Sequence, residues 1–116
     1  MEDFISINTF HILKDKGMSI NKEHSFKYLL QRYKNDGWES LYIYLPSLYD
    51  VQKWIREKHN ITISVEPYDT QWCYILYDLN KINKDSFEHI IIDSNINFDT
   101  YEEALEEGIK NALNKI

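Results

Sequence analysis

Aromatic and basic side chains alternate along residues 26–44, and no other stretch of the sequence has residue types so suited to recognising a ligand. Aromatic rings stack on nucleobases or fill protein hot spots, while lysine and arginine contact phosphates and carboxylates. Core aromatics with snorkelling basic neighbours would give the same pattern, and both interpretations stay open. If the segment is a hairpin, we expect four residues to share one sheet face: Tyr28, Arg32, Tyr42 and Tyr44. The candidate binding residues are Lys27, Tyr28, Arg32, Tyr33, Trp38, Tyr42 and Tyr44.

The sequence carries no pattern typical of catalysis or metal binding. Its only cysteine, Cys73, excludes an intramolecular disulfide and a thiolate cluster, and three glycines provide no glycine-rich phosphate loop. No serine has the local context of a nucleophile turn. The four histidines lack helical ligand spacing: His11, His24, His59 and His89. We therefore predict a non-enzymatic protein with no catalytic residues, no metal and no cofactor.

The charge is unevenly distributed. A net charge of -6 argues against binding duplex nucleic acid. Residues 11–34 contain six basic and two acidic side chains, whereas residues 60–109 contain eleven acidic and two basic ones. Such polarity can steer a partner, although it can also serve solubility alone.

The N-terminal third is expected to form a helix and then a hairpin. Residues 6–16 have an N-cap candidate in Ser6 or Asn8 and a stop at Gly17. Residues 21–34 fit both a helical face and strand alternation. Asn35-Asp36-Gly37 is a strong turn signal, and residues 39–45 beyond it are aromatic and β-branched. We favour a hairpin for this region.

The remaining residues predict an α-β-β-β-α core. Ser47 begins a helix that ends near Asn60, and strands are expected at 61–66, 71–79 and 87–93. Thr100 and Glu103 form a capping box for the last helix, on which Glu106 and Lys110 should pair. The fold class is therefore α+β, a three-stranded antiparallel meander with both helices on one face. We predict one domain, 1–116, with the helix and hairpin in 1–45 and the core in 46–116.

Several segments resemble a group of small phage- and prophage-encoded proteins of unknown function. They are Leu-Pro-Ser at 45–47, Trp-Ile-Arg-Glu-Lys-His-Asn-Ile at 54–61 and Thr-Tyr-Glu-Glu-Ala-Leu at 100–105. The resemblance implies a phage-type setting, in which small acidic proteins often bind host proteins. The β-β-β-α portion also resembles the antitoxin subunit of one class of toxin–antitoxin pair. The core order is similar to that of double-stranded RNA-binding domains, but glutamates occupy the start of the last helix, where those domains present lysines.

These features lead to three functional hypotheses. The first is a phage-type protein-binding module that inhibits a host defence or regulatory protein, with a host or phage protein as its partner. The alternative is a binder of a small molecule, nucleotide or single-stranded nucleic acid, and the third is an antitoxin-like partner protein. A homo-oligomer stays open. The acidic start at residues 1–3 and the lack of a long apolar run predict a cytoplasmic protein without a membrane partner.

Overall fold

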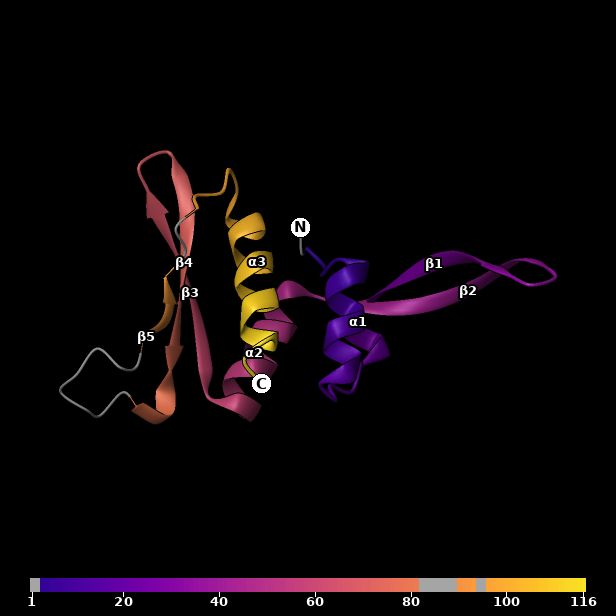
Figure 1. Ribbon diagram of the computed structural model, residues 1–116, viewed down its shortest axis with the longest axis horizontal. Helices are drawn as coiled ribbons and strands as arrows, with labels where there is room; N and C mark the ends of the chain where they lie inside the picture. Colours follow the sequence, from indigo (N-terminus) through magenta and orange to yellow (C-terminus); the bar gives the residue numbers. More distant parts are fainter. Residues whose placement is uncertain (1–2, 82–89, 94–95) are drawn as a thin grey trace.

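The computed structural model describes residues 3–81, 90–93 and 96–116. These residues form an α+β fold, as the sequence predicts (Figure 1). The helices are α1 (Ile7–Asp15), α2 (Leu48–His59) and α3 (Tyr101–Leu113), with short 3-10 turns at Lys22–His24 and Leu79–Lys81. The strands are β1 (Ser25–Lys34), β2 (Gly37–Pro46), β3 (Ile61–Tyr68), β4 (Gln71–Asp78) and β5 (Ile90–Asp93).

Strands β3, β4 and β5 form the predicted antiparallel meander, with β4 in the centre. Helix α3 packs on β3 and β4, and α2 packs on β3, so both helices cover one face of this sheet (Figure 1). The third strand begins at Ile90 among the described residues. Residues 87–89, which the sequence also assigns to it, lie outside the described residues.

Local capping explains where the helices begin and end. The Ser47 hydroxyl accepts a hydrogen bond from the Asp50 N–H at 3.1 Å, and the Thr100 hydroxyl accepts one from the Glu103 N–H at 3.1 Å. Ser6, rather than Asn8, caps α1. Asn60 ends α2 in the left-handed conformation, with φ 57°. The hydroxyls of Ser6, Ser47 and Thr100 satisfy N–H groups that the start of a helix leaves unpaired, so the sequence predicts the helix boundaries closely.

The core lies between the helices and the three-stranded sheet. Helix α3 approaches the sheet so closely that a Cβ atom on Gly108 would lie 2.8 Å from Cγ2 of Ile63 and 3.3 Å from the Tyr74 ring. Glycine is therefore required there by the packing distance. Helix α1 and the end of β2 add side chains to the same buried cluster. Its members include Ile5, Phe10, Leu13, Leu45, Val51, Ile55, Leu76, Ile109 and Leu113.

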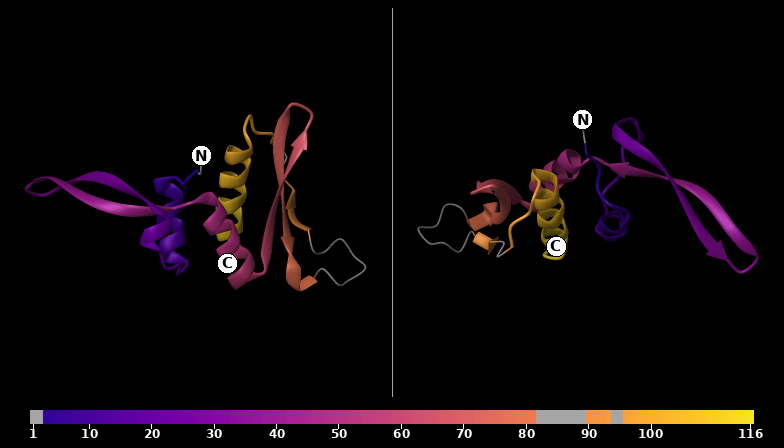
Figure 2. Two further views of the ribbon diagram at one scale, coloured as in Figure 1. Left: turned by 180° about the vertical axis from the view of Figure 1, so that it is seen from behind. Right: turned by 90° about the horizontal axis from the view of Figure 1, so that it is seen from above.

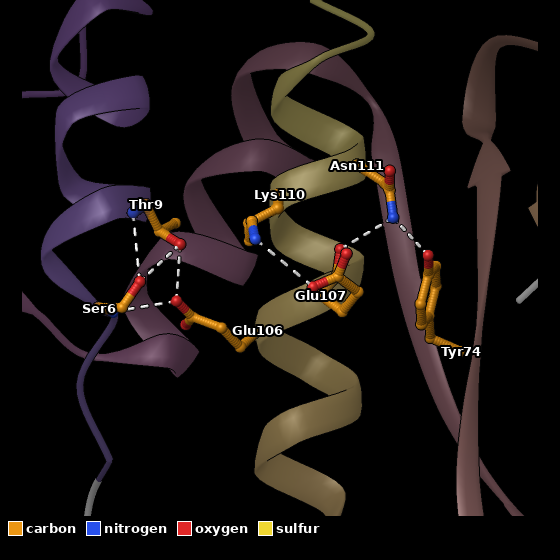
Figure 3. A network of polar contacts seen from close by, with 7 residues as sticks. All are labelled: Ser6, Thr9, Tyr74, Glu106, Glu107, Lys110 and Asn111. Carbon is orange, nitrogen blue, oxygen red and sulfur yellow. Dashed lines mark hydrogen bonds and ion pairs between the residues drawn. The ribbon is translucent and has the colours of Figure 1, made fainter. Parts of the chain in front are cut away.

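Glu106 joins α3 to α1 through hydrogen bonds (Figure 3). One carboxylate oxygen accepts from the Ser6 N–H at 3.0 Å and from the Thr9 hydroxyl at 2.6 Å. The predicted pair between Glu106 and Lys110 is wrong, because Lys110 instead approaches Glu107 at 3.6 Å. Glu106 is turned toward α1, so one glutamate of the acidic helix has a structural role.

On the other side of α3, the Tyr74 hydroxyl accepts a hydrogen bond from the Asn111 amide (Figure 3). Burial raises the pKa of Tyr74 above its ordinary value, and the nearby Glu107 carboxylate adds to this effect. The bond from Asn111 acts in the opposite direction. The neutral phenol thus helps to hold α3 against β4.

Strands β1 and β2 form a separate two-stranded sheet that projects from the rest of the molecule (Figures 1 and 2). The radius of gyration is 16.1 Å, with principal extents of 59 × 32 × 28 Å. A compact domain of this length has a radius of gyration of about 13 Å. The projecting sheet accounts for the elongated shape, since it extends along the long axis, away from the three-stranded sheet.

Candidate binding surface on the projecting hairpin

The hairpin arm, residues 25–46, confirms the hairpin that the turn signal favours. Its two strands pair antiparallel without a register shift, from Ser25 opposite Pro46 to Lys34 opposite Gly37. Asn35 and Asp36 form the turn between them. Gly37 adopts φ +134°, which other residues rarely adopt, so a glycine is needed where β2 begins.

This register divides the candidate binding residues between two faces. Residues directly opposite each other in an antiparallel pair lie on the same face, and successive residues alternate. Lys27 is opposite Tyr44, whereas Tyr28 is opposite Ile43. The expectation that Tyr28 and Arg32 share a face with Tyr42 and Tyr44 is therefore wrong. The pairing with a two-residue turn places even-numbered residues of β1 opposite odd-numbered residues of β2.

One side of the arm is a lysine–aromatic face, made of Lys27, Leu29, Tyr33, Trp38, Tyr42 and Tyr44. The Lys27 ammonium group lies 4.0 Å from the centroid of the Tyr42 ring, which is a cation–π contact across the strands. Nearer the tip, Tyr33 and Trp38 pack edge to face with centroids 5.7 Å apart. Trp38 is 75% exposed and Tyr33 is 67% exposed, so these rings are offered to solvent rather than to the core.

The other side is an apolar face, made of Phe26, Tyr28, Leu30, Leu41, Ile43 and Leu45. Its base joins the body of the protein, since Leu45 is buried and the Phe26 ring lies 5.3 Å from that of Phe4. Along this face towards the tip, Phe26 is followed by the half-exposed Leu30 and then by an ion-pair cluster. Among the described contacts, the apolar face is therefore anchored at its base and not at the tip.

The ion-pair cluster near the tip contains Arg32, Lys34 and Glu39. The Glu39 carboxylate is 2.8 Å from the Lys34 ammonium group and 2.9 Å from Nε of Arg32. Hydrogen bonds from Lys34 and then from Arg32 hold the pKa of Glu39 below its ordinary value. Arg32 is thus occupied by an intramolecular carboxylate.

A groove of about 310 Å³ lies where the arm meets α1. Its lining combines rings from both elements with lysines: Phe10, Lys14, Ile20, Lys22, Tyr42, Ile43 and Tyr44. The Lys14 ammonium group is 5.7 Å from the Phe10 ring centroid, and that of Lys22 is 5.2 Å from the Tyr44 ring centroid. No acidic residue lines this groove among the described residues, so it is a positive site on an acidic protein.

Sequence reasoning identified Tyr42 and Tyr44 of this groove but missed Phe10, Lys14 and Lys22. The excess of basic residues between 11 and 34 was the available signal. This excess of basic residues does not by itself locate a binding site, because α1 and β2 come together at the groove only through tertiary packing.

A second groove, of about 520 Å³, lies between the start of α1 and α3. Phe4, Leu48 and Phe98 supply its apolar lining, and glutamates of α3 surround them. Since Glu106 there already binds Ser6 and Thr9, part of this acidic surface is engaged in holding the fold.

Within residues 3–81, 90–93 and 96–116, no group of three or more histidine, cysteine, aspartate or glutamate side chains is arranged to hold a metal ion. In the same part of the chain, no helix has the length and apolar character needed to cross a membrane.

In comparisons with known proteins, no family model, no curated protein and no solved structure matches this chain. The resemblance to phage-encoded proteins therefore stays a prediction, and the function has to be argued from the surface itself.

Proposed function

We propose that this protein is a non-enzymatic protein-binding module whose hairpin arm contacts the partner. The observation that carries the proposal is the exposure of this hairpin, whose two strands have ten residues each. No other described strand pairs with it, and no described helix covers it along its length. Isolated two-stranded hairpins are only marginally stable in water. A partner that covers the arm would bury the surface that the fold leaves exposed.

The residue types of the arm also support protein binding. Tyrosine, tryptophan and arginine are enriched in protein hot spots because they bury a large area while keeping a polar group. Trp38, Tyr33 and Tyr42 are all more than half exposed on one face. Apolar surface of this kind, rimmed by polar residues, is typical of interaction sites rather than of an ordinary solvated strand.

We extend the proposal to the biological setting through the sequence resemblance. In a phage-type setting, the partner would be a host defence or regulatory protein that the module inhibits. A phage early operon or a defence locus around the gene would favour this setting. A neighbouring toxin gene would favour the antitoxin-like hypothesis instead.

The experiment compares partner capture by two double variants of the full chain, which replace exposed aromatic residues on the arm or outside it. Immobilised protein with Trp38→Ser and Tyr42→Ser should lose a partner that the unaltered chain retains from host lysate. The control is Tyr49→Ser with Tyr68→Ser, because Tyr49 and Tyr42 are each 58% exposed but Tyr49 lies outside the arm. Equal capture by both double variants, or no specific partner at all, would contradict the proposal.

The groove at the base of the arm favours a second candidate function, the binding of a nucleotide or single-stranded nucleic acid. Tyr42 and Tyr44 offer stacking surfaces, and Lys14 and Lys22 offer charges for phosphate. A ligand present at a hundred times its dissociation constant would stabilise the fold by about 2.7 kcal/mol. Thermal unfolding with mononucleotides and short oligonucleotides tests this candidate, and an unchanged melting temperature across the panel would remove it.

A further inference from the structure

The outer edge of β2 presents main-chain groups in a regular order, and within residues 3–81, 90–93 and 96–116 no strand pairs with them beyond the base of the arm. The Ile5 N–H donates to the Pro46 carbonyl at 3.1 Å, so the carbonyl of Pro46 points away from β1. Main-chain groups alternate in direction along a strand. The N–H and C=O groups that share this outward direction belong to four residues of β2: Trp38, Ser40, Tyr42 and Tyr44.

Residues 3–5 cover only the base of this edge. Phe4 forms an isolated bridge with Ser47, and the Leu48 N–H donates to the Asp3 carbonyl at 2.9 Å. Beyond that point the chain turns into α1. No described strand pairs with the edge from Trp38 to Tyr44. The short contact at the base shows the geometry in which a further extended segment can continue along β2.

The exposed edge runs through the positive groove. Tyr42, Ile43 and Tyr44 of β2 line it together with Phe10 and Lys14 of α1. Lys22 lies over the Tyr44 ring and Lys27 over the Tyr42 ring. Unpaired main-chain groups and ammonium groups thus occur together beside the same two residues.

We propose that an extended acidic segment of the partner protein adds to the outer edge of β2 as a further strand. Its main chain would hydrogen-bond with Ser40, Tyr42 and Tyr44, and its carboxylates would lie beside Lys14, Lys22 and Lys27. Strand addition takes its affinity from main-chain hydrogen bonds and its specificity from alternate side chains. The repeated spacing of the outward groups fits a peptide main chain, whereas a single nucleotide would use the rings and lysines alone.

This inference rests on the proposed protein-binding function and names the chemistry of the partner. Its test uses a short labelled peptide in which glutamate and valine alternate, with binding followed by fluorescence anisotropy. Two matched peptides are the controls. One replaces every glutamate with lysine, and the other carries N-methyl groups on alternate amides, which remove edge hydrogen bonds without changing the charge. We expect binding of the first peptide only.

The chain offers a matched pair of edge variants, because Gln31 and Ser40 are directly opposite each other. By the alternation above, both point their N–H groups outward, Gln31 from β1 and Ser40 from β2. Proline is tolerated on an edge strand where the N–H faces solvent. Ser40→Pro should weaken binding of the acidic peptide by about tenfold or more, whereas Gln31→Pro should leave it within about twofold. The N-methylated peptide tests the same hydrogen bonds in the unaltered protein, in case Ser40→Pro disturbs the fold.

Charge reversal tests the other half of the inference. Lys22→Glu should weaken binding and reduce its dependence on salt, while Lys115→Glu, an equal change at an exposed position near the end of the chain, should not. Equal effects of both reversals would mean that peptide binding depends only on the net charge of the protein, which would overturn the inference.

Four other results would also overturn it. Equal binding of the methylated peptide would mean that main-chain pairing is not used. Displacement of the peptide by a mononucleotide, with no effect of Ser40→Pro, would assign the groove to a nucleotide. A dimer of the protein that Ser40→Pro dissociates would assign the edge to a second copy. If the peptide fails while partner capture still depends on Trp38 and Tyr42, strand addition is wrong and the proposed function stands.

Discussion

Two antiparallel hairpins, β1–β2 and β3–β4, are similar in construction but differ in their surroundings. Strands β1 and β2 pair without a shift from Lys34 opposite Gly37, and β3 and β4 pair in the same way from Tyr68 opposite Gln71. Each has a two-residue turn. Yet β3 and β4 are covered by α3 on one face and extended by β5, while no other described strand extends the sheet of β1 and β2 and no described helix covers it along its length.

The difference lies in what the rest of the chain supplies to each hairpin. In β3, Ile61 and Ile63 are buried, and the residue between them, Thr62, faces away from the helices. The arm carries an apolar face as well, but large side chains of that face such as Phe26 and Tyr28 remain exposed because no described helix packs along them. Apolar residues in a strand therefore become part of a hydrophobic core only where another element packs on them. Topology decides which of them become a core and which remain available to a partner.

The largest expected effect contrasts one leucine from each hairpin. Leu76 of β4 is fully buried and Leu29 of β1 is 44% exposed. Leu76→Ala should reduce the free energy of unfolding by about 2–5 kcal/mol, because it leaves a cavity in the core. Leu29→Ala should change it by no more than about 0.5 kcal/mol. Urea unfolding followed by circular dichroism measures both, and similar losses for the two variants would mean that the arm is part of the cooperative core.

Gly108→Val tests how tightly the covered hairpin is packed. The added side chain would start 2.8 Å from Cγ2 of Ile63, so α3 and β3 would have to separate. We expect a loss of about 1–3 kcal/mol from overpacking. The melting temperature reports it, with Gly37→Ala in the arm as the comparison, since its cost arises from φ +134° rather than from contact. An unchanged melting temperature for Gly108→Val would show that the close approach of α3 is not required.

Thr100→Ala should have a smaller effect, because it removes only the hydrogen bond to the Glu103 N–H at the start of α3. We expect a loss of about 1 kcal/mol, which Thr100→Ser should largely restore. Chemical denaturation of the three proteins provides the measurement. If Thr100→Ser is as unstable as Thr100→Ala, the hydroxyl is not acting as the cap.

Local chemistry determined the parts of the fold that the sequence predicted well. Caps such as Ser47 and Thr100 act on amides within three residues, so their consequences can be predicted without the tertiary structure. The hairpin followed from Asn35-Asp36-Gly37 in the same way. The pair between Glu106 and Lys110 failed because Ser6 and Thr9, which lie close only in the folded protein, compete for the carboxylate.

The binding surface was predicted in part, and the error has a simple origin. A three-residue turn would have placed Tyr28 on the face of Tyr42 and Tyr44. The two-residue turn shifts the pairing by one position, and a shift of one residue moves every side chain to the other face. The groove lysines were not predicted, because Lys14 of α1 and Lys22 of the 3-10 turn before β1 come close to β2 only in the folded protein.

The smallest expected effect concerns the tip of the arm. Since the Glu39 carboxyl has a lowered pKa in the folded protein, the stability that it contributes is present above its unfolded pKa and is lost as the pH falls through the folded value. NMR titration should give a midpoint below the usual value of about 4.3, and Lys34→Gln should raise it. The overall melting temperature should not change in Lys34→Gln, because the pair is exposed. An ordinary midpoint for Glu39 would show that the cluster does not persist in solution.

Amide hydrogen exchange with and without the alternating acidic peptide tests the central claim most directly, because it compares both hairpins in one experiment. In the free protein, we predict fast exchange for the outward amides of Ser40, Tyr42 and Tyr44 and slow exchange for the paired amides of β3 and β4. With peptide, the β2 edge should gain protection while Gln31 on the opposite edge should not. Protection of the β2 edge in the free protein, or equal protection of both edges with peptide, would contradict the account.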